Sequence, residues 1–557
     1  MVDNQTAQGL IMRQILLSLV LVSTGFPSEA SEPAQQVGDR PNIIVLMAED
    51  LSSRIGAFGD PVASTPNLDA LAARGVRYPN VFTTAGVCAP SRAAHITGMY
   101  QISIGAQHMR SSTFGEASYL AVPPPEVKAY PELLRRAGYF TFTSRKLDYQ
   151  FSTWAPGSGP FTIWDSETPE PQWKGKRPDQ PFFGLVNLPQ THESQVFDKH
   201  VYPNRKKGLE QITNPEDVIV PPYYPDTPTV REYLARHYDN VHTMDKYAGS
   251  VLARLEADGL LDNTIILWTT DHGDGLPRSK RELYDSGIKV PMIVVWPEKY
   301  RPDWVKPGGV DEQLVSFLDL SASVLRLAGV PLPDHLHGKP VLVDKDTKRE
   351  YVFAAKDRLD EHVFRERAVR DDRYKYLRNY VPDKPGATHL AYRDQQAIMR
   401  ELWELSEGGK LNAQQQYWFD PRPRVELYDL QSDPHEVKNL AGDPEFADTL
   451  RRLSAAMDTW LARVGDTSDG LELEMAYRFW PDGVQPVTDL PQIRTVGNGQ
   501  AVIEPATQGA SIAYRVDQGK WLAYAPGAQI DVPSGSELSA RSVRYGWEAS
   551  DIVTQRF

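Results

Sequence analysis

Residues 41–50 read Pro-Asn-Ile-Ile-Val-Leu-Met-Ala-Glu-Asp, an apolar run that ends in two adjacent acids. Such an uninterrupted run predicts a strand buried on both faces, as in a parallel sheet that helices cover on either side. A second apolar run, at 264–270, ends in a similar way, because Asp271 and His272 follow it directly. Ligands of open α/β sheets bind outside the carboxyl ends of the strands, so both polar pairs are candidates for one site.

Helical and apolar segments alternate through the first part of the chain. Helical spacing and end signals predict helices at 66–74, 131–138 and 238–259, and apolar runs predict strands at 139–143, 182–188 and 290–296. Thr65 is the expected N-cap of the first of these helices. The alternation predicts an α/β fold, with a mixed, largely parallel sheet sandwiched by helices, over residues 40–345.

The character of the sequence changes at about residue 346. Short strands, followed by a helix that Asp443 caps, predict a smaller α+β subdomain at 346–465. The segment 480–557 is rich in turns and alternates apolar with other residues, as in Ile512, Tyr514 and Val516. This pattern predicts a small β-sandwich-like domain, so the chain should end in a β-rich tail.

Charge and cysteine content restrict the function more than the overall composition does. The 557 residues include 60 Lys and Arg against 73 Asp and Glu, which gives a formal net charge of −13. An acidic chain of this kind is not expected to bind nucleic acid. The chain has one cysteine, Cys88, so it forms no internal disulfide.

The N-terminus has the features of a secretory signal peptide at residues 1–30. Arg13 precedes an apolar run at 15–22, and Ser28-Glu29-Ala30 resembles a cleavage site. Polar residues are unusual ahead of such a signal, so translation is expected to start at Met12. The run is too short to span a bilayer, although an uncleaved anchor is an alternative. We therefore expect a periplasmic or secreted protein with no membrane span after signal removal.

The segment Cys88-Ala89-Pro90-Ser91-Arg92 resembles the Cys-x-Pro-Ser-Arg signature of type I sulfatases, which have the alkaline-phosphatase-like fold. The resemblance continues in Thr97-Gly98-Met99-Tyr100 and covers about residues 40–465. In that family a formylglycine-generating enzyme converts the cysteine to formylglycine. One hydroxyl of the hydrated aldehyde attacks sulfur, and the second later expels sulfate. The resemblance thus implies covalent catalysis at Cys88 and makes the maturation enzyme a partner.

The resemblance also implies one divalent cation beside this nucleophile. Glu49 and Asp50 match the adjacent acidic ligands of the family, Asp271 and His272 match its later pair, and Cys88 completes the expected set. Hard oxygen ligands favour Ca²⁺, with Mg²⁺ or Mn²⁺ as alternatives. Two departures from the family pattern are Glu49 in place of Asp and the nitrogen donor of His272.

Three cations are expected around the reacting sulfate. Arg92 would lie one helical turn after the cysteine and hold the nucleophile and the metal ligands in place. Lys146 lies in Arg145-Lys146-Leu147-Asp148, which resembles the family's Lys-x-His motif. Lys280 precedes Leu283-Tyr284-Asp285-Ser286-Gly287, which resembles the family's Leu-Tyr-Glu-Gly-Gly. Both lysines would touch sulfate oxygens, where negative charge grows in the transition state.

Proton transfer to the departing alcohol is assigned to His192, which follows the predicted strand at 182–188 as a histidine does in the family. A histidine can protonate a leaving group near neutral pH. Asp148 takes the place of the family's other histidine, so it is expected to bind sugar or to orient the nucleophile, and it is the alternative acid. His108 and Arg110 follow a loop and are candidates for the substrate pocket.

These features predict hydrolysis of sulfate esters, with a sulfated carbohydrate as the expected substrate. Two alternatives stay open: a phosphonate or phosphate ester hydrolase of the same superfamily, and a non-catalytic protein that binds sulfated glycans. The 12 tryptophans and 25 tyrosines can supply surfaces on which sugars stack, although most aromatic side chains belong to protein cores.

Overall fold

The computed structural model describes residues 40–113, 116–199, 210–497 and 499–557. The predicted signal peptide at residues 1–30, with its start at Met12, lies outside the described residues. Within the described ranges, none of the helices combines the length and the apolar character that a membrane span requires.

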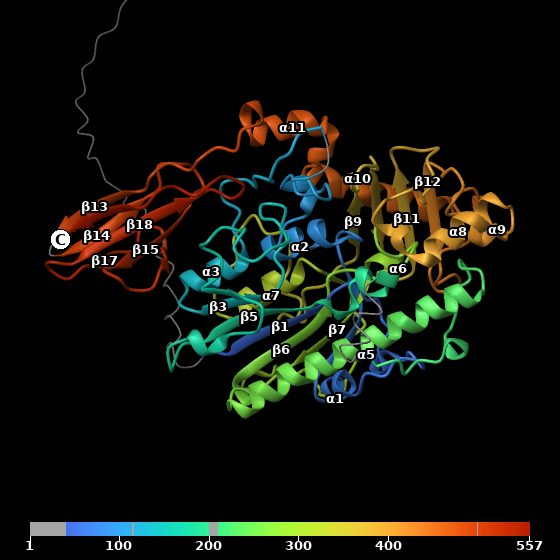
Figure 1. The fold of residues 1–557 in the computed structure, drawn as a ribbon, viewed down its shortest axis with the longest axis horizontal. Coiled ribbons are helices and arrows are strands. Elements are labelled where there is room, and N and C mark those ends of the chain that lie inside the picture. The colour runs from blue at the N-terminus through green and yellow to red at the C-terminus, as the bar shows by residue number, and fades with distance from the viewer. Residues whose placement is uncertain (1–39, 114–115, 200–209, 498) are drawn as a thin grey trace, which may run out of the picture. The chain divides into compact units, whose positions relative to one another are not determined.

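A mixed sheet of eight strands forms between residues 42 and 316 (Figure 1). In spatial order its strands are β4 (Ser166–Thr168), β3 (Phe140–Ser144), β5 (Phe182–Leu188), β1 (Asn42–Ala48), β6 (Thr264–Thr270), β7 (Lys289–Val295), β2 (Val76–Phe82) and β8 (Val315–Ser316). Neighbouring strands are parallel except at β7, which runs antiparallel to both β6 and β2. The predicted mixed and largely parallel sheet is therefore confirmed.

The register of the three central strands determines where a site can form. Ala48 at the end of β1 lies opposite Leu188 of β5 and opposite Thr270 of β6. The three strands therefore end at the same level, and the residues that follow each of them emerge together at one edge of the sheet.

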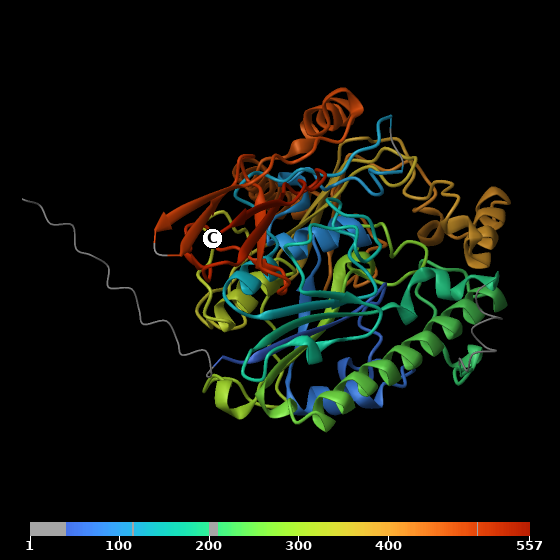
Figure 2. The ribbon, with the colours of Figure 1, turned by 60° about the vertical axis from the view of Figure 1, so that its left-hand side comes forward.

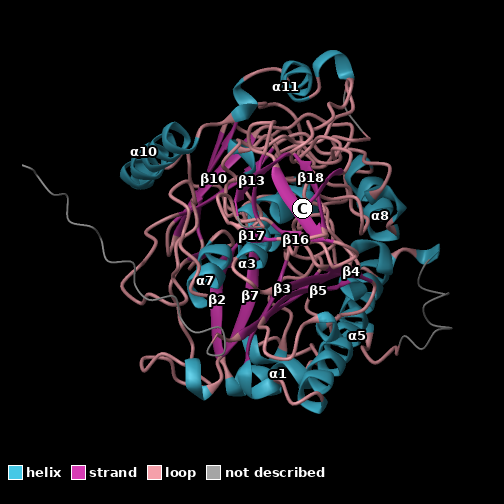
Figure 3. Ribbon diagram, turned by 90° about the vertical axis from the view of Figure 1, so that its left-hand side faces the viewer, coloured by secondary structure: helices cyan, strands magenta, loops and turns pink. Residues whose placement is uncertain are grey.

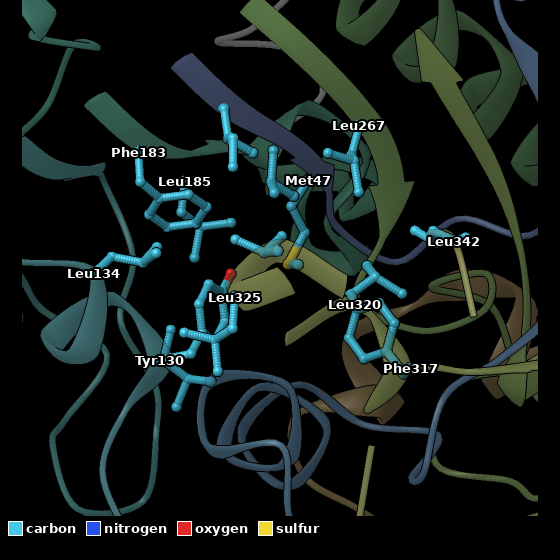
Figure 4. Packing of buried hydrophobic residues seen from close by; sticks show 14 of the residues in the cluster. Met47, Tyr130, Leu134, Phe183, Leu185, Leu267, Phe317, Leu320, Leu325 and Leu342 are labelled. Atoms are coloured by element: carbon cyan, nitrogen blue, oxygen red, sulfur yellow. The ribbon is translucent and has the colours of Figure 1, made fainter. Parts of the chain in front are cut away.

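One face of the sheet packs against α3 (Tyr130–Arg136) and α7 (Asp319–Leu327). Ile43, Val45 and Met47 point to this face and are fully buried. Figure 4 shows Met47 among residues of these helices, including Tyr130 and Leu320.

The opposite face packs against α1 (Pro66–Arg74) and α5 (Pro228–Ala257). It receives the alternate residues of β1, Ile44, Leu46 and Ala48. The separation of α1 and α5 from α3 and α7 by the sheet is visible in Figure 1 and again in the rotated views of Figure 2 and Figure 3. Helices on both faces explain why β1 is apolar at consecutive positions.

Helix α1 begins and ends where the sequence predicted, and Thr65 is its N-cap residue, but the Thr65 side chain does not cap the helix. The Thr65 hydroxyl bonds no amide of the helix. It accepts a hydrogen bond from the Gly56 amide at 3.0 Å and donates one to Asp69 Oδ1 at 3.1 Å. The Thr65 hydroxyl is therefore used by the Gly56 amide and the Asp69 carboxylate, and it does not bind a free amide at the start of the helix.

A second, antiparallel sheet follows the first in the chain. Its order is β12 (Val425–Asp429), β11 (Tyr374–Asn379), β10 (Glu366–Arg370) and β9 (Val352–Lys356). Helix α10 (Ala447–Val464) packs on it through Leu453, Met457 and Trp460. Helices α8 (Ala397–Glu407) and α9 (Ala413–Gln416), which the sequence did not predict, lie between β11 and β12 in the chain. This unit is the smaller α+β part that the fold prediction expected.

The C-terminal part consists of two small antiparallel sheets. One contains β13 (Gln492–Gly497), β14 (Gln500–Glu504) and β17 (Ile530–Asp531); the other contains β16 (Leu522–Ala523), β15 (Ser511–Val516), β18 (Glu537–Val543) and β19 (Val553–Arg556). Both sheets contribute to one apolar cluster, which agrees with the β-rich tail of the predicted fold. The tail contacts α3, since Glu132 accepts hydrogen bonds from Ser511 Oγ at 2.6 Å and from the Tyr545 hydroxyl at 2.7 Å.

Candidate active site

The two polar pairs that follow β1 and β6 meet at the carboxyl edge of the large sheet. Glu49 and Asp50 follow β1, and Asp271 and His272 follow β6. The Asp50 amide donates to Asp271 Oδ1 at 3.0 Å, and His272 Nε2 lies 3.1 Å from Asp50 Oδ1. All four side chains are buried, so this edge concentrates ionisable groups away from water.

Cys88 is the first residue of α2 (Cys88–Thr97) and points into this cluster. Its Sγ lies 3.3 Å from His272 Nε2 and 3.8 Å from Asp50 Oδ1. One turn later, Arg92 donates from Nε to Asp271 Oδ2 at 3.0 Å, and its Nη2 lies 3.7 Å from Glu49 Oε1. The helix therefore brings the cysteine and the arginine to the same acidic cluster.

The cluster has the donors that a hard divalent cation prefers. One ligand atom from each of Asp50, Cys88, Asp271 and His272 lies within 4.8 Å of all the others. Burial opposes protonation of His272, but the carboxylates of Asp271 and Asp50 outweigh burial and raise its pKa to about 10. The acids thus attract positive charge to this position, and a metal ion would take the place of that proton. Carboxylates with one imidazole fit Ca²⁺, Mg²⁺ or Mn²⁺.

Two buried lysines approach the cluster from the side of the cavity. Lys146 Nζ lies 3.0 Å from Glu49 Oε2, and Lys280 Nζ lies 2.6 Å from Asp50 Oδ2. Burial opposes ionisation of the Cys88 thiol, but these two ammonium groups outweigh burial and lower the thiol pKa to about 6. The electrostatic field at Cys88 therefore favours an anion, whether a nucleophile or a bound sulfate.

A cavity of about 650 Å³ opens above Cys88. Six of the residues predicted for the site line it: Glu49, Cys88, Arg110, Lys146, His192 and Lys280. His192 follows β5, its Nδ1 lies 2.9 Å from Ser194 Oγ, and its Nε2 lies 3.9 Å from Glu49 Oε2. Nε2, the ring nitrogen that does not contact Ser194, therefore faces the site.

The remaining predicted residues are placed differently. Asp148 is buried and forms an ion pair with Arg110. Arg110 lines the cavity, but Asp148 does not. His108 is also absent from the lining: its Nδ1 accepts a hydrogen bond from the Arg358 amide at 3.2 Å. This placement argues against the predicted substrate contact of His108, because its ring is used to hold two loops together.

Residues that no sequence pattern marked also line the cavity: Met109, Thr113, Trp154, Pro189, Glu193, Gln195, Arg281, Asp360, Glu361, Ala391 and Tyr392. Glu193 and Arg281 were within reach of sequence reasoning, because each directly follows a predicted site residue. Trp154, Asp360 and Tyr392 come from three separate loops, and no local pattern in those loops points to a common site.

Left-handed backbone conformations gather around this cavity. Of the twelve non-glycine residues with positive φ in the described ranges, six belong to the site: Asp50, Arg110, Arg145, Asp148, Arg281 and Asp360. Such conformations are unfavourable for residues with a Cβ and persist where surrounding contacts enforce them, commonly at functional sites. The concentration of strain supports a functional assignment of the cavity that is independent of any motif.

Comparison with solved structures shows the fold that the chain shares with known proteins. The chain resembles a structure described as a 2-O GAG sulfatase, with a TM-score of 0.54 and 20% identity over 78% of this chain and 94% of the other. It also resembles the phosphonate monoester hydrolase of Agrobacterium radiobacter, with a TM-score of 0.50 and 18% identity over 76% of this chain and 96% of the other. At these identities the likeness shows the fold alone, which is alkaline-phosphatase-like.

Comparison of sequences defines the family. A family model described as Sulfatase matches residues 41–330, and one described as N-sulphoglucosamine sulphohydrolase, C-terminal, matches residues 277–402. An ulvan-active sulfatase of Formosa agariphila is 38% identical over 556 residues, which cover 92% of this chain and 91% of the relative. Human N-sulphoglucosamine sulphohydrolase is 28% identical over 75% of this chain and 89% of its own length. The chain belongs to the sulfatase family and is a sulfuric ester hydrolase.

Proposed function

We propose that this enzyme hydrolyses sulfate esters of carbohydrates, with a nucleophile made from Cys88 and the help of one divalent cation. The observation that carries the proposal is the position of Cys88, which lines the cavity and adjoins the buried acidic cluster. Its Sγ lies 3.3 Å from His272 on the acidic side, and Lys146 and Lys280 line the same cavity on the cationic side. This arrangement suits an anionic ester whose sulfur must approach position 88.

The cation would be held by Asp50, Asp271 and His272, with position 88 beside them. Glu49, which was predicted as a further ligand, lies with Asp50 and His192 instead and would complete the set only from the side of His192. We propose Ca²⁺, with Mg²⁺ and Mn²⁺ as alternatives, because oxygen donors predominate. A divalent ion at such a site lowers the pKa of a hydroxyl nucleophile and neutralises negative charge that develops on the ester. Arg92 keeps the ligand set in order, since it binds Asp271 directly.

Position 88 would be formylglycine, installed by a formylglycine-generating enzyme during export. The hydrated aldehyde supplies one hydroxyl that attacks sulfur and a second that allows sulfate to leave. The residues of this chain then have separate tasks. Lys146 and Lys280 bind sulfate oxygens, and His192 donates a proton from Nε2 to the departing sugar oxygen. Asp148 orients Arg110 toward the substrate, as their ion pair supports.

The carbohydrate substrate is supported by the relatives. Three of the proteins that the chain resembles are described as an ulvan-active sulfatase, an N-sulphoglucosamine sulphohydrolase and a 2-O GAG sulfatase. We place this chemistry in a catalytic domain of residues 40–345, followed by the subdomain 346–465 and the tail domain 480–557. The predicted signal peptide supports a periplasmic or secreted enzyme.

The test is sulfate release by matured protein from a panel of sulfated oligosaccharides, beside a phosphonate monoester and a phosphate diester. Cys88→Ala protein is the control, because it removes the group from which the nucleophile is made. We expect the wild-type protein to release sulfate at a rate well above that on the phosphorus esters, and the variant to release none. Faster turnover of the phosphonate would establish the alternative enzyme, and binding of glycans without turnover would establish a sulfated-glycan-binding protein.

A further inference from the structure

We propose that the outer part of the cavity is a second sugar subsite, in which Trp154 and Tyr392 stack on the residue next to the sulfated one. This inference rests on the proposed function, because it takes a carbohydrate ester to lie at position 88. It concerns a part of the cavity that the sulfate chemistry does not use.

Trp154 is 60% exposed, although tryptophan is among the largest apolar side chains of the protein. Tryptophan is a highly buried residue type on average, and this exposed indole lies in the lining of the cavity that contains Cys88. The loop that carries Trp154 is fixed to the Lys146 segment, since the Leu147 amide donates to the Trp154 carbonyl at 3.0 Å and the Asp148 amide donates to the Thr153 carbonyl at 3.0 Å. The backbone that carries the indole is therefore held beside the segment of Lys146.

Tyr392 lines the same cavity from a different loop and is 39% exposed. Its ring packs against Phe197 in an edge-on arrangement, with 5.3 Å between the ring centroids and 62° between the ring planes. This contact fixes the ring while leaving part of it open to solvent. Tryptophan and tyrosine rings that are fixed and exposed supply apolar contact area at low entropic cost, which suits the apolar faces of pyranose rings.

The hydroxyl groups of a sugar need hydrogen-bond partners, and the cavity offers both a donor and an acceptor. Arg110 can donate, and it is held by the buried Asp148. Asp360 can accept, and its carbonyl receives a hydrogen bond from Arg358 Nη1 at 2.6 Å, which secures the turn that carries it. Both residues have positive φ, at 59° and 47°, so their placement in the cavity is enforced against local preference.

The volume of the cavity is large enough for more than one sugar residue. Cavities of roughly 300–1,000 Å³ accommodate ligands of drug size, and this one measures about 650 Å³. Because Cys88 lies in the same lining as Trp154 and Tyr392, one continuous ligand can reach from the nucleophile to both aromatic rings. The structure thus assigns the enzyme a preference for sulfated oligosaccharides over sulfated monosaccharides.

Trp154→Ala and Tyr392→Ala test the subsite, with Tyr477→Ala as the matched control. Tyr477 is 48% exposed and does not line the cavity. The substrates are the sulfated disaccharide that the wild-type protein hydrolyses fastest and the sulfated monosaccharide with the same reacting residue. We expect each cavity variant to raise the ratio of the disaccharide KM to the monosaccharide KM by about tenfold. The control should leave the ratio unchanged.

An unchanged ratio in both cavity variants would overturn the subsite, and so would equal KM values for the two substrates in wild-type protein. Either result would leave the proposed function standing if sulfate is still released. A binding measurement makes the test independent of turnover: calorimetric titration of Cys88→Ala protein with unsulfated disaccharides of the same panel. Binding that Trp154→Ala weakens about tenfold would support the subsite, and binding that neither aromatic substitution alters would overturn it. Absence of sulfate release from every carbohydrate would instead refute the proposed function.

Discussion

Arg281 and Glu193 form a two-point ion pair in the lining of the cavity, with Nη1 to Oε2 and Nη2 to Oε1 both at 2.9 Å. Both side chains are buried, and Glu193 Oε1 also lies 2.9 Å from Lys280 Nζ. The Arg281 amide donates to the Gly86 carbonyl at 2.6 Å. The pair therefore joins the loop before α2, the segment of His192 and the segment of Lys280.

Glu193→Gln is expected to damage both stability and turnover. The substitution leaves the Arg281 guanidinium and the Lys280 ammonium buried without their shared counter-charge. Breaking a buried pair in this way costs about 3–5 kcal/mol of unfolding free energy. We expect kcat to fall by about tenfold or more because Lys280 loses one of its two anchors.

The measurements are urea unfolding and kcat on one sulfate ester. Asp448→Asn is the control, because it breaks an exposed ion pair with Arg451. Exposed pairs of this kind contribute about 1 kcal/mol or less. A loss in Glu193→Gln no larger than in the control would show that the pair does not organise the site.

His192→Ala and Asp148→Asn separate the two candidates for the leaving-group acid. A sugar alkoxide needs a proton as it departs, whereas nitrophenolate leaves without one. If His192 is the acid, its removal lowers kcat on a sugar sulfate by about 100-fold or more and has a much smaller effect on 4-nitrophenyl sulfate. Asp148→Asn should mainly raise KM, because it releases Arg110. The reverse pattern would make Asp148 the acid.

Removal of the metal is expected to lower the thermal stability of the protein, an effect that can be measured without an activity assay. Without a cation, Asp50 and Asp271 are buried carboxylates close to each other at the edge of the sheet. A cation at about 100 times its Kd would add about 3 kcal/mol. We therefore expect Ca²⁺ to raise Tm of chelator-treated protein, and Asp271→Asn to abolish most of the increase. The same Tm in chelator and in Ca²⁺ would contradict the assigned ligand set.

Stability should depend on pH through His95, which lies on α2 and is buried. Burial, with a further contribution from Arg92, lowers the pKa of His95 to about 3. The unfolded chain binds this proton at about pH 6.5. The unfolded state therefore holds more protons between these values, and stability falls as pH decreases from 6.5 toward 3.

The expected loss from this one group is about 2 kcal/mol between about pH 7 and pH 5. His95→Gln removes the titration and keeps a polar group near the Tyr130 hydroxyl, which lies 3.1 Å from His95 Nε2. Urea unfolding at both pH values should show a flatter dependence in the variant. The same dependence in both proteins would mean that other groups determine it.

The central strands of the large sheet were predictable from the chain because each is a largely apolar run. The strands predicted at 182–188 and 264–270 are β5 and β6, with the same bounds. Once parallel strands were expected, their carboxyl ends had to meet, so Glu49, Asp50 and Asp271 could be assigned to one place.

The outer cavity could not be predicted in this way. Trp154, Asp360 and Tyr392 lie in loops without periodicity, and only tertiary packing brings them together. The ion pair of Arg110 with Asp148 likewise joins positions that have no local relationship in the sequence. Residues of this kind can be identified only from the tertiary structure. Residues at strand ends can be predicted from the apolar runs that precede them.

Mass spectrometry of the peptide that contains position 88 tests the formylglycine mechanism most directly. The protein should be purified after export from a host with a formylglycine-generating enzyme, and sulfate release should be measured on the same sample. We expect formylglycine at position 88, with specific activity proportional to its fraction in the preparation. Full activity from protein whose Cys88 is an unmodified thiol would contradict this mechanism.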